Sequence, residues 1–246
     1  MGTMSLSGRA AIVTGAASGI GAAVARHLRQ LGAQVAGIDL APAPDASLSC
    51  QVDLRDDNAI ASAVKRAAAA HGEATILVHC AGVCPPGSLL ESDDATYLET
   101  YDINVVSAIR LLRHCAPAMG RAGGGAVVVI SSINARFATP TLAAYAASKA
   151  ALESLVRTAA LELAPSRIRV NAIAPGSIDT PMLQASFQRE ADPAAARERN
   201  VERHPLGRLG VVEDVAELAS FLVGKGSTWI TGAIVPVDGG AAVTRR

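Results

Sequence analysis

The chain has 246 residues, of which 50% are hydrophobic and only 18% charged, so it can bury a sizeable core as one large domain or two small ones. Its 22 basic and 22 acidic side chains give a formal net charge of zero, which removes the electrostatic case for binding nucleic acid or an anionic membrane. Four cysteines and five scattered histidines indicate neither a disulfide framework nor a metal site. No signal peptide or apolar run of membrane-spanning length is visible, so we expect a soluble, cytoplasmic protein.

The first 39 residues contain the order of elements that a dinucleotide site needs. An apolar run over 10–14 predicts a buried strand, a glycine-rich turn over 15–21 follows, and residues 22–31 have helical periodicity. A second buried strand over 34–38 ends at Asp39. Glycines allow the backbone to approach a pyrophosphate, and a helix N-terminus offers N–H groups to it. Asp39, 18 residues beyond Gly21, is placed to accept hydrogen bonds from the adenosine ribose.

The alternation of apolar runs and helical stretches continues to the end of the chain. We expect strands over 48–52, 75–79, 126–130, 168–173 and 233–237, helices over 56–71, 93–119 and 212–223, a helix around Tyr145 ending near residue 164, and a polar segment over 177–210. Continuous hydrophobic strands separated by helices predict a parallel sheet covered on both faces. With no linker or repeat visible, the sequence predicts one doubly wound α/β domain over residues 1–246, with about seven strands.

Tyr145 and Lys149 are four positions apart in a helical stretch, so both side chains lie on one face of the helix. A free tyrosine titrates near pH 10, and a neighbouring cation favours its phenolate. Lowering the phenol pKa by roughly 2–3 units takes about 3–4 kcal/mol and would give a general acid/base that works near neutrality. A tyrosine and a lysine at this spacing often occur by chance, so the pair by itself is weak evidence.

Eight motifs in order make the chain resemble the short-chain dehydrogenase/reductase family, in its short single-domain form, from about Gly8 to Gly240. They are Thr14-Gly15-Ala-Ala-Ser-Gly19-Ile20-Gly21, Asp53-Leu54, Cys80-Ala81-Gly82, Asn104-Val105, Ser131-Ser132, Tyr145-x-x-x-Lys149, Pro175-Gly176 with Thr180, and Asp238-Gly239-Gly240. Their conjunction is far more specific than any one motif.

That resemblance implies hydride transfer between a nicotinamide cofactor and an alcohol or carbonyl carbon, with no metal. It implies that Tyr145 is the acid/base and that Lys149 lowers its pKa and bonds the nicotinamide ribose. Ser132, at the family's usual spacing, would bond the substrate oxygen in preference to Ser131, and Asn104 would hold a water that links Lys149 to solvent. The alternative for Asn104 is a satisfied polar residue of a long helix.

The same resemblance implies a cofactor site made from several segments. Asp53 would bond the adenine, and Thr180 the nicotinamide carboxamide. The full expected cofactor set is Gly15, Ser18, Gly19, Ile20, Gly21, Asp39, Asp53, Leu54, Cys80, Ala81, Gly82, Tyr145, Lys149, Pro175, Gly176 and Thr180. The carboxylate of Asp39 would repel the additional phosphate of NADP, and neither Ser18 nor Leu40 is basic, so the sequence predicts NAD.

Two stretches depart from the family's usual pattern. His79-Cys80-Ala81-Gly82 stands where the family often has Asn-Asn-Ala-Gly, and we interpret His79 as a structural replacement for asparagine. Only residues 40–48 separate Asp39 from the next strand, which leaves little room for a helix there.

The substrate pocket is expected to be lined by residues 83–87, 133–142 and a lid over about 177–206. Asn134, Arg136 and Leu142 are weaker candidates for substrate contact. The lid holds Arg189, Arg197, Arg199 and Arg203, which nearby acids offset, so a solvated helix with paired charges is favoured over a carboxylate clamp.

The leading hypothesis is an NAD-dependent dehydrogenase of a small secondary alcohol, such as a hydroxy acid, polyol, sugar-derived acid or cyclic alcohol. A 3-oxoacyl-thioester reductase of the same family is the alternative, although Asp39 disfavours the NADPH that biosynthetic reduction generally uses. A regulator that senses dinucleotides without catalysis is a remote third possibility. Apolar helix positions such as Leu152, Leu155, Val156 and Leu161 exceed what one core face needs, so we expect a homotetramer.

Overall fold

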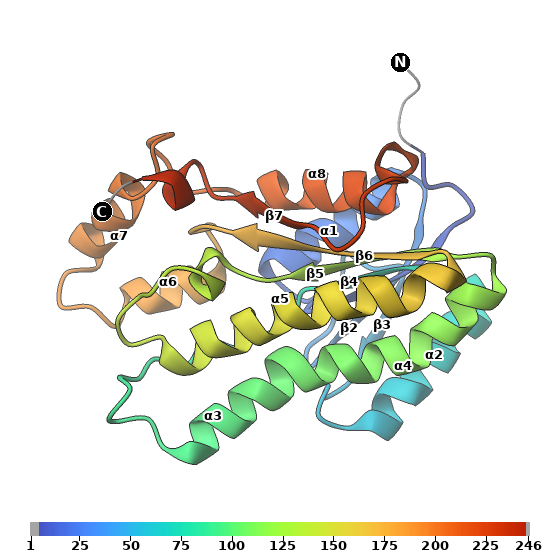
Figure 1. Ribbon diagram of the computed structural model, residues 1–246, viewed down its shortest axis with the longest axis horizontal. Helices are drawn as coiled ribbons and strands as arrows, with labels where there is room; N and C mark the ends of the chain where they lie inside the picture. Colours follow the sequence, from blue (N-terminus) through green and yellow to red (C-terminus); the bar gives the residue numbers. More distant parts are fainter. Residues whose placement is uncertain (1–4, 245–246) are drawn as a thin grey trace.

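The computed structural model describes residues 5–244 and arranges them around a seven-stranded parallel sheet (Figure 1). The strand order is β3-β2-β1-β4-β5-β6-β7. The strands are β1 (Ala10–Thr14), β2 (Gln34–Asp39), β3 (Leu48–Gln51), β4 (Ala74–His79), β5 (Gly125–Ile130), β6 (Ile168–Pro175) and β7 (Ile234–Val237). The expected doubly wound α/β fold is confirmed, and its seven strands match the predicted ones to within two residues at each end.

Helices cover both faces of this sheet and bury a separate apolar layer on each. The helices are α1 (Gly19–Gln30), α2 (Asp57–His71), α3 (Asp94–Tyr101), α4 (Ser107–Arg121), α5 (Ala143–Leu163), α6 (Pro181–Phe187), α7 (Pro193–Glu202) and α8 (Val212–Val223). Side chains of α1 and α8 form one layer, and those of α2, α4 and α5 form the other (Figure 1). The central strands are buried on both sides, which explains why β1 and β5 read as unbroken apolar runs.

The helix expected over 93–119 differs from the structure in one turn. A π-helical turn over Asp102–Val106 separates α3 from α4, and Asn104 lies within it. A π turn adds one residue to the helical repeat, which a hydrophobic pattern of period 3.6 does not reveal. The continuous helix carries a local bulge at the position of the predicted site asparagine.

The polar segment over 177–210 contains two short helices: α6, which was not predicted, and α7, which lies in the charged stretch expected to form a solvated helix. Thr180 and Asp192 are the N-cap residues of α6 and α7, and each side chain accepts a backbone N–H of its own helix. Phe187, Ala196 and Leu209 bury a small apolar cluster of their own beneath this segment. The segment over 40–47 contains no helix, as expected.

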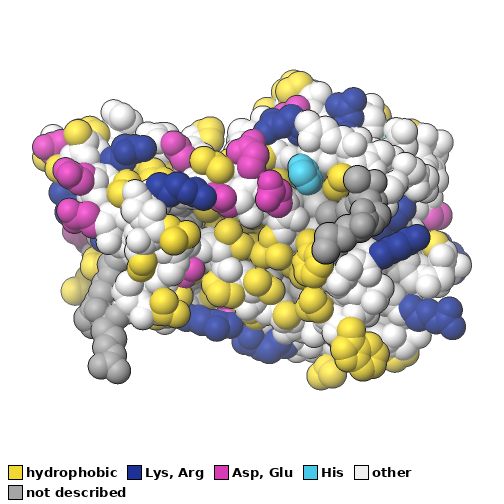
Figure 2. Space-filling view, turned by 90° about the horizontal axis from the view of Figure 1, so that it is seen from above, with side chains coloured by type: hydrophobic (Ala, Val, Ile, Leu, Met, Phe, Trp, Pro, Cys, Tyr) yellow, Lys and Arg dark blue, Asp and Glu magenta, His cyan; other side chains and the backbone are white. Residues whose placement is uncertain are grey.

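Within residues 5–244 no helix is both long and apolar enough to cross a membrane. The β7 edge of the sheet and α8 form the upper side of the molecule in Figure 1. The view from above shows hydrophobic side chains gathered in the middle of that face (Figure 2). Phe221 on α8 is partly exposed, and Trp229, which precedes β7, is 99% exposed.

Candidate active site

The glycine-rich turn joins the end of β1 to the start of α1, as a dinucleotide site requires. Gly15 has φ +65°, and a Cβ there would lie 2.8 Å from the backbone nitrogen of Ala81. A Cβ on Gly21 would overlap the carbonyl of Gly15. Side chains are therefore excluded at both positions. The bare backbone of the turn leads into the N-terminus of α1, whose N-cap is Ser18, and this arrangement fits a pyrophosphate.

Asp39 ends β2 beside this turn and has a fixed orientation. Its Oδ2 accepts the Ala17 N–H at 3.0 Å, and its Oδ1 accepts the Ala41 N–H at 3.1 Å. The side chain is partly exposed, and Leu40 beside it is 70% exposed. A carboxylate with free lone pairs therefore faces the region where the turn would hold the adenosine ribose.

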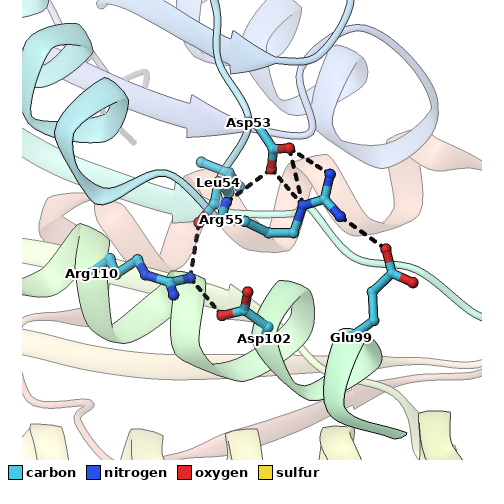
Figure 3. Close-up of polar contacts among 6 residues, drawn as sticks. All are labelled: Asp53, Leu54, Arg55, Glu99, Asp102 and Arg110. Carbon is cyan, nitrogen blue, oxygen red and sulfur yellow. Dashed lines mark hydrogen bonds and ion pairs between the residues drawn. The ribbon is translucent and has the colours of Figure 1, made fainter. Parts of the chain in front are cut away.

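The segment containing Asp53 and Leu54 is tied to the helices beside it (Figure 3). Arg55 bonds both oxygens of Asp53, and this pairing lowers the pKa of the Asp53 carboxyl. Arg55 also pairs with Glu99 of α3 at 3.0 Å, and Arg110 of α4 donates to the Leu54 carbonyl at 3.1 Å. The predicted adenine-binding segment is held in place by these contacts, and the carboxylate of Asp53 has an arginine partner.

His79 ends β4 inside a chain of buried hydrogen bonds. Thr14 Oγ1 accepts the N–H groups of Cys80 and Ala81, each at 3.2 Å, and lies 2.8 Å from His79 Nδ1. His79 Nε2 lies 3.3 Å from Ser107 Oγ, whose hydroxyl donates to the Ile103 carbonyl. Burial lowers the pKa of His79 to about 3, with a further contribution from Lys149. These contacts agree with a structural role for His79 that joins β1, β4 and the π turn.

Asn104, fully buried in the π turn, lies between the loop after β4 and helix α5. Its Oδ1 accepts the Val83 N–H at 2.8 Å, and its Nδ2 donates to the Val83 carbonyl and to Ser148 Oγ. A Cβ on Gly82 would lie 3.1 Å from Asn104 Oδ1 and 3.4 Å from Lys149 Nζ, which places Gly82 between the two side chains. The bulge thus brings the predicted asparagine next to the predicted lysine.

The two serines at the end of β5 point to different partners. Ser132 Oγ accepts the Asn134 N–H at 3.1 Å and hydrogen-bonds toward Tyr145, an interaction that favours a lower pKa of the phenol. Ser131 Oγ instead donates to Glu153 Oε1 at 3.3 Å. The preference for Ser132 over Ser131 as the serine of the site agrees with this geometry.

Tyr145 and Lys149 lie together in the first two turns of α5, as their spacing predicts. Lys149 Nζ is 5.6 Å from the Tyr145 ring centroid and donates to the Ile130 carbonyl at 2.8 Å. Burial lowers the pKa of Lys149 to about 8. Burial also raises the pKa of Tyr145, and the Cys84 thiol raises it further. Burial thus outweighs the effect of Ser132 on the Tyr145 pKa, and Lys149 bonds the Ile130 carbonyl, so the lowering of that pKa by Lys149 stays a prediction.

Pro175, Gly176 and Thr180 form the opposite side of the cofactor region. Pro175 ends β6, and the Gly176 N–H bonds the Val237 carbonyl at 2.9 Å. A Cβ on Gly19 would lie 3.4 Å from Thr180 Cγ2, so the glycine-rich turn and the start of α6 face each other. The segments after β1 and β6 that hold expected cofactor residues therefore lie side by side, and their binding of a cofactor stays a prediction.

The three weaker substrate candidates lie on the loop between β5 and α5, with different contacts. Arg136 Nε bonds Glu153 Oε2 at 3.3 Å, so its charge has a partner on the protein. Asn134 Oδ1 accepts a hydrogen bond from Thr139 Oγ1. Leu142 forms an isolated parallel β-bridge with Gly87, which lies in the loop after β4. The loops over 83–87 and 133–142 therefore lie against each other, and their contact with substrate stays a prediction.

The sequence analysis missed two polar residues of α5 that take part in this arrangement. Ser148 joins Asn104 to the Tyr145 carbonyl, and Glu153 is a carboxylate only 3% exposed. An isolated polar residue on a mostly apolar helix gives no periodic signal, although the spacing of four residues between Lys149 and Glu153 would have placed both on the same face. Among residues 5–244, no group of three or more His, Cys, Asp or Glu side chains is arranged to hold a metal ion.

A parallel sheet with this glycine-rich turn and this Ser–Tyr–Lys arrangement defines a nicotinamide-dependent oxidoreductase, and the chain belongs to the short-chain dehydrogenase/reductase family. Residues 15–242 match the family described as enoyl-(acyl carrier protein) reductase. The family acts on alcohol or carbonyl groups with NAD or NADP.

Individual relatives cover nearly the whole chain. A cis-4-hydroxycyclohexanecarboxylate dehydrogenase of Sinomonas cyclohexanicum is 38% identical, over 94% of this chain and 96% of the relative. A 3-oxoacyl-(acyl-carrier-protein) reductase of Pseudomonas aeruginosa is 34% identical, over 96% of this chain and 98% of the relative. The ligand-free aldohexose dehydrogenase of Thermoplasma acidophilum has a TM-score of 0.93 at 28% identity, with 99% of this chain and 98% of that chain covered.

Proposed function

We propose that the protein is an NAD-dependent dehydrogenase of a small secondary alcohol, with a cyclic hydroxy acid as the first substrate class to test. The observation that carries the cofactor choice is the oriented carboxylate of Asp39 beside the glycine-rich turn. This carboxylate accepts hydrogen bonds from ribose hydroxyls and repels a 2′-phosphate. The similarity to a hydroxycyclohexanecarboxylate dehydrogenase supports the substrate class.

The cofactor residues present fit this dinucleotide. At Gly15 and Gly21 any side chain would collide with neighbouring backbone, so the turn presents only its backbone to the cofactor. Thr180 lies opposite Gly19. NAD, when bound, supplies the hydride acceptor and, in its oxidised form, a positively charged ring. The proposed roles are those expected from the family: Asp53, Leu54 and the turn at Cys80-Ala81-Gly82 border the adenosine half, and Lys149 bonds the nicotinamide ribose.

Tyr145 is the proposed general acid/base, and Ser132 holds the substrate oxygen beside it. The two side chains come from the end of β5 and the start of α5, and their hydrogen bond makes the phenol easier to ionise. Burial opposes ionisation, so the phenolate needs positive charge nearby. Lys149 contributes this charge, with its Nζ 5.6 Å from the centroid of the Tyr145 ring. The proton leaves through the hydrogen-bonded polar groups around Asn104.

The alternative, a 3-oxoacyl-thioester reductase, is supported by relatives of that activity at 34% identity. Asp39 disfavours it, because the carboxylate stands where NADPH carries its additional phosphate. The remote alternative is a dinucleotide-sensing protein without catalysis. Such a protein would not need Ser132 beside Tyr145, so the presence of both residues disfavours it.

The direct test measures NADH formation across hydroxy acids, polyols, sugar acids and cyclic alcohols, beginning with cis-4-hydroxycyclohexanecarboxylate, with NADP in parallel. Strong NAD-linked turnover on one group is the expected result. Activity only with NADP would overturn the cofactor argument and favour the 3-oxoacyl reductase. Cofactor binding without turnover of any alcohol or 3-oxoacyl thioester would favour the sensing protein.

We further propose a cytoplasmic homotetramer in which the segment over 177–206 acts as a lid. The four free cysteines fit a reducing compartment. Exposed apolar side chains such as Leu161 and Trp229 support self-association. His204 Nε2 accepts the Ser177 N–H at 3.1 Å, so the two ends of the proposed lid are joined at its base. Light scattering that gives a monomer would contradict the assembly.

A further inference from the structure

Glu153 is a buried carboxylate that the proposed chemistry does not use. It lies on α5, one turn after Lys149, and is 3% exposed. Burial of a carboxylate is costly unless charged and hydrogen-bonding partners surround it. Glu153 has three such partners: Ser131 at 3.3 Å, Arg136 at 3.3 Å and Arg157 at 4.0 Å.

Two of these partners flank Ser132 in the chain. Ser131 immediately precedes it, and Arg136 ends the short 3₁₀ turn over Ile133–Ala135 that Ser132 caps. Glu153 Oε1 accepts from Ser131, whereas Oε2 accepts from Arg136. One carboxylate on the helix of Tyr145 and Lys149 therefore bonds side chains on both sides of Ser132.

We propose that Glu153 is a positioning residue, which sets the distance between Ser132 and Tyr145 by clamping the end of β5 and its turn to α5. The inference rests on the proposed function, because it concerns the two side chains assigned to the substrate oxygen. A Ser132 turn released from α5 moves relative to the phenol without any loss of cofactor residues. Misplacement of a reacting group by about 1 Å costs on the order of 10²-fold in rate.

The chain offers a matched pair of variants for this proposal. Arg136 and Arg157 are both 54% exposed and both pair with Glu153 Oε2. Arg136 belongs to the Ser132 turn, whereas Arg157 lies on α5 itself, four residues after Glu153. Loss of either removes a positive charge near the same carboxylate, but only loss of Arg136 removes one of the two bonds that hold the Ser132 turn to Glu153.

The experiment compares Arg136→Ala with Arg157→Ala in the NAD-linked assay on whichever alcohol the wild-type protein oxidises. We expect kcat to fall roughly 10-fold or more for Arg136→Ala, with KM for the alcohol and Kd for NADH unchanged, and to stay within about twofold for Arg157→Ala. NADH binding is measured by fluorescence titration, and thermal unfolding of both variants controls for stability.

A second comparison uses Glu153 itself. Glu153→Gln retains an acceptor for Arg136 and a donor for Ser131, so it should keep most of the wild-type kcat, whereas Glu153→Leu should lose it. If Arg136→Ala raises KM with kcat intact, Arg136 contacts substrate and the positioning role is overturned. Equal kcat losses in Arg136→Ala and Arg157→Ala, tracking stability, also overturn it. A wild-type protein without turnover refutes the proposed function instead, and the positioning role with it.

Discussion

Replacing His79 with asparagine should make the protein more resistant to acid. Thr14 Oγ1 already accepts two backbone N–H groups, so its own proton is directed to His79 Nδ1. His79 Nε2 then carries the ring proton and donates to Ser107. A protonated ring would present a second N–H to the occupied Thr14 oxygen, so this site favours neutral histidine.

The magnitude follows from the shift in the His79 pKa from 6.5 to about 3. As the pH falls below 6.5, the unfolded chain takes up a proton that the folded protein excludes until about pH 3, so stability is lost with falling pH. The loss is about 1.4 kcal/mol per pH unit and reaches about 5 kcal/mol over the whole interval. Asparagine can accept from Thr14 and donate to Ser107 without titrating.

The assay is urea unfolding of the wild-type and His79→Asn proteins between pH 7 and pH 4. Carboxylates and other histidines titrate alike in both, so the difference between the two stability curves isolates His79. We expect this difference to change by about 1.4 kcal/mol per pH unit below pH 6, in favour of the variant. Parallel curves would refute the assigned tautomer and the role of burial.

Two further predictions concern the proposed activity. Tyr145→Phe should reduce turnover by roughly 10²- to 10⁴-fold while fluorescence titration shows unchanged NADH binding, and full activity would remove Tyr145 from the chemistry. Asp39→Ala should raise KM for NAD and allow turnover with NADP, whereas an unchanged cofactor ratio would contradict the charge argument.

The sequence predicts the sheet well, because buried parallel strands and the turns between them give local signals. The apolar run at β1, the glycines after it and Asp39 at the end of β2 are all readable without coordinates. The π turn around Asn104 cannot be predicted from the sequence, since one extra residue in a helix leaves the apolar pattern nearly unchanged.

Properties that depend on three-dimensional surroundings were predicted least well. Spacing alone placed Lys149 beside Tyr145, but the direction of the phenol pKa depends on burial and on the Ile130 carbonyl that binds the lysine. Likewise, Arg136 looked available to substrate until its pairing with Glu153 was visible. Long-range partners of this kind have no signature in the spacing of residues along one segment.

The strand order has a consequence for how the chain reaches its fold. β1 lies between β2 and β4, so one edge of β1 pairs early, while the other has no partner until residues 74–79 have been synthesised. β4 must then cross to the far side of β1, carrying α2 over the sheet, and the remaining strands add outward from it. Such non-local pairing folds slowly and leaves apolar edges exposed in partly made chains. A nascent chain halted before β4 should therefore be more prone to aggregation and proteolysis than one halted after it.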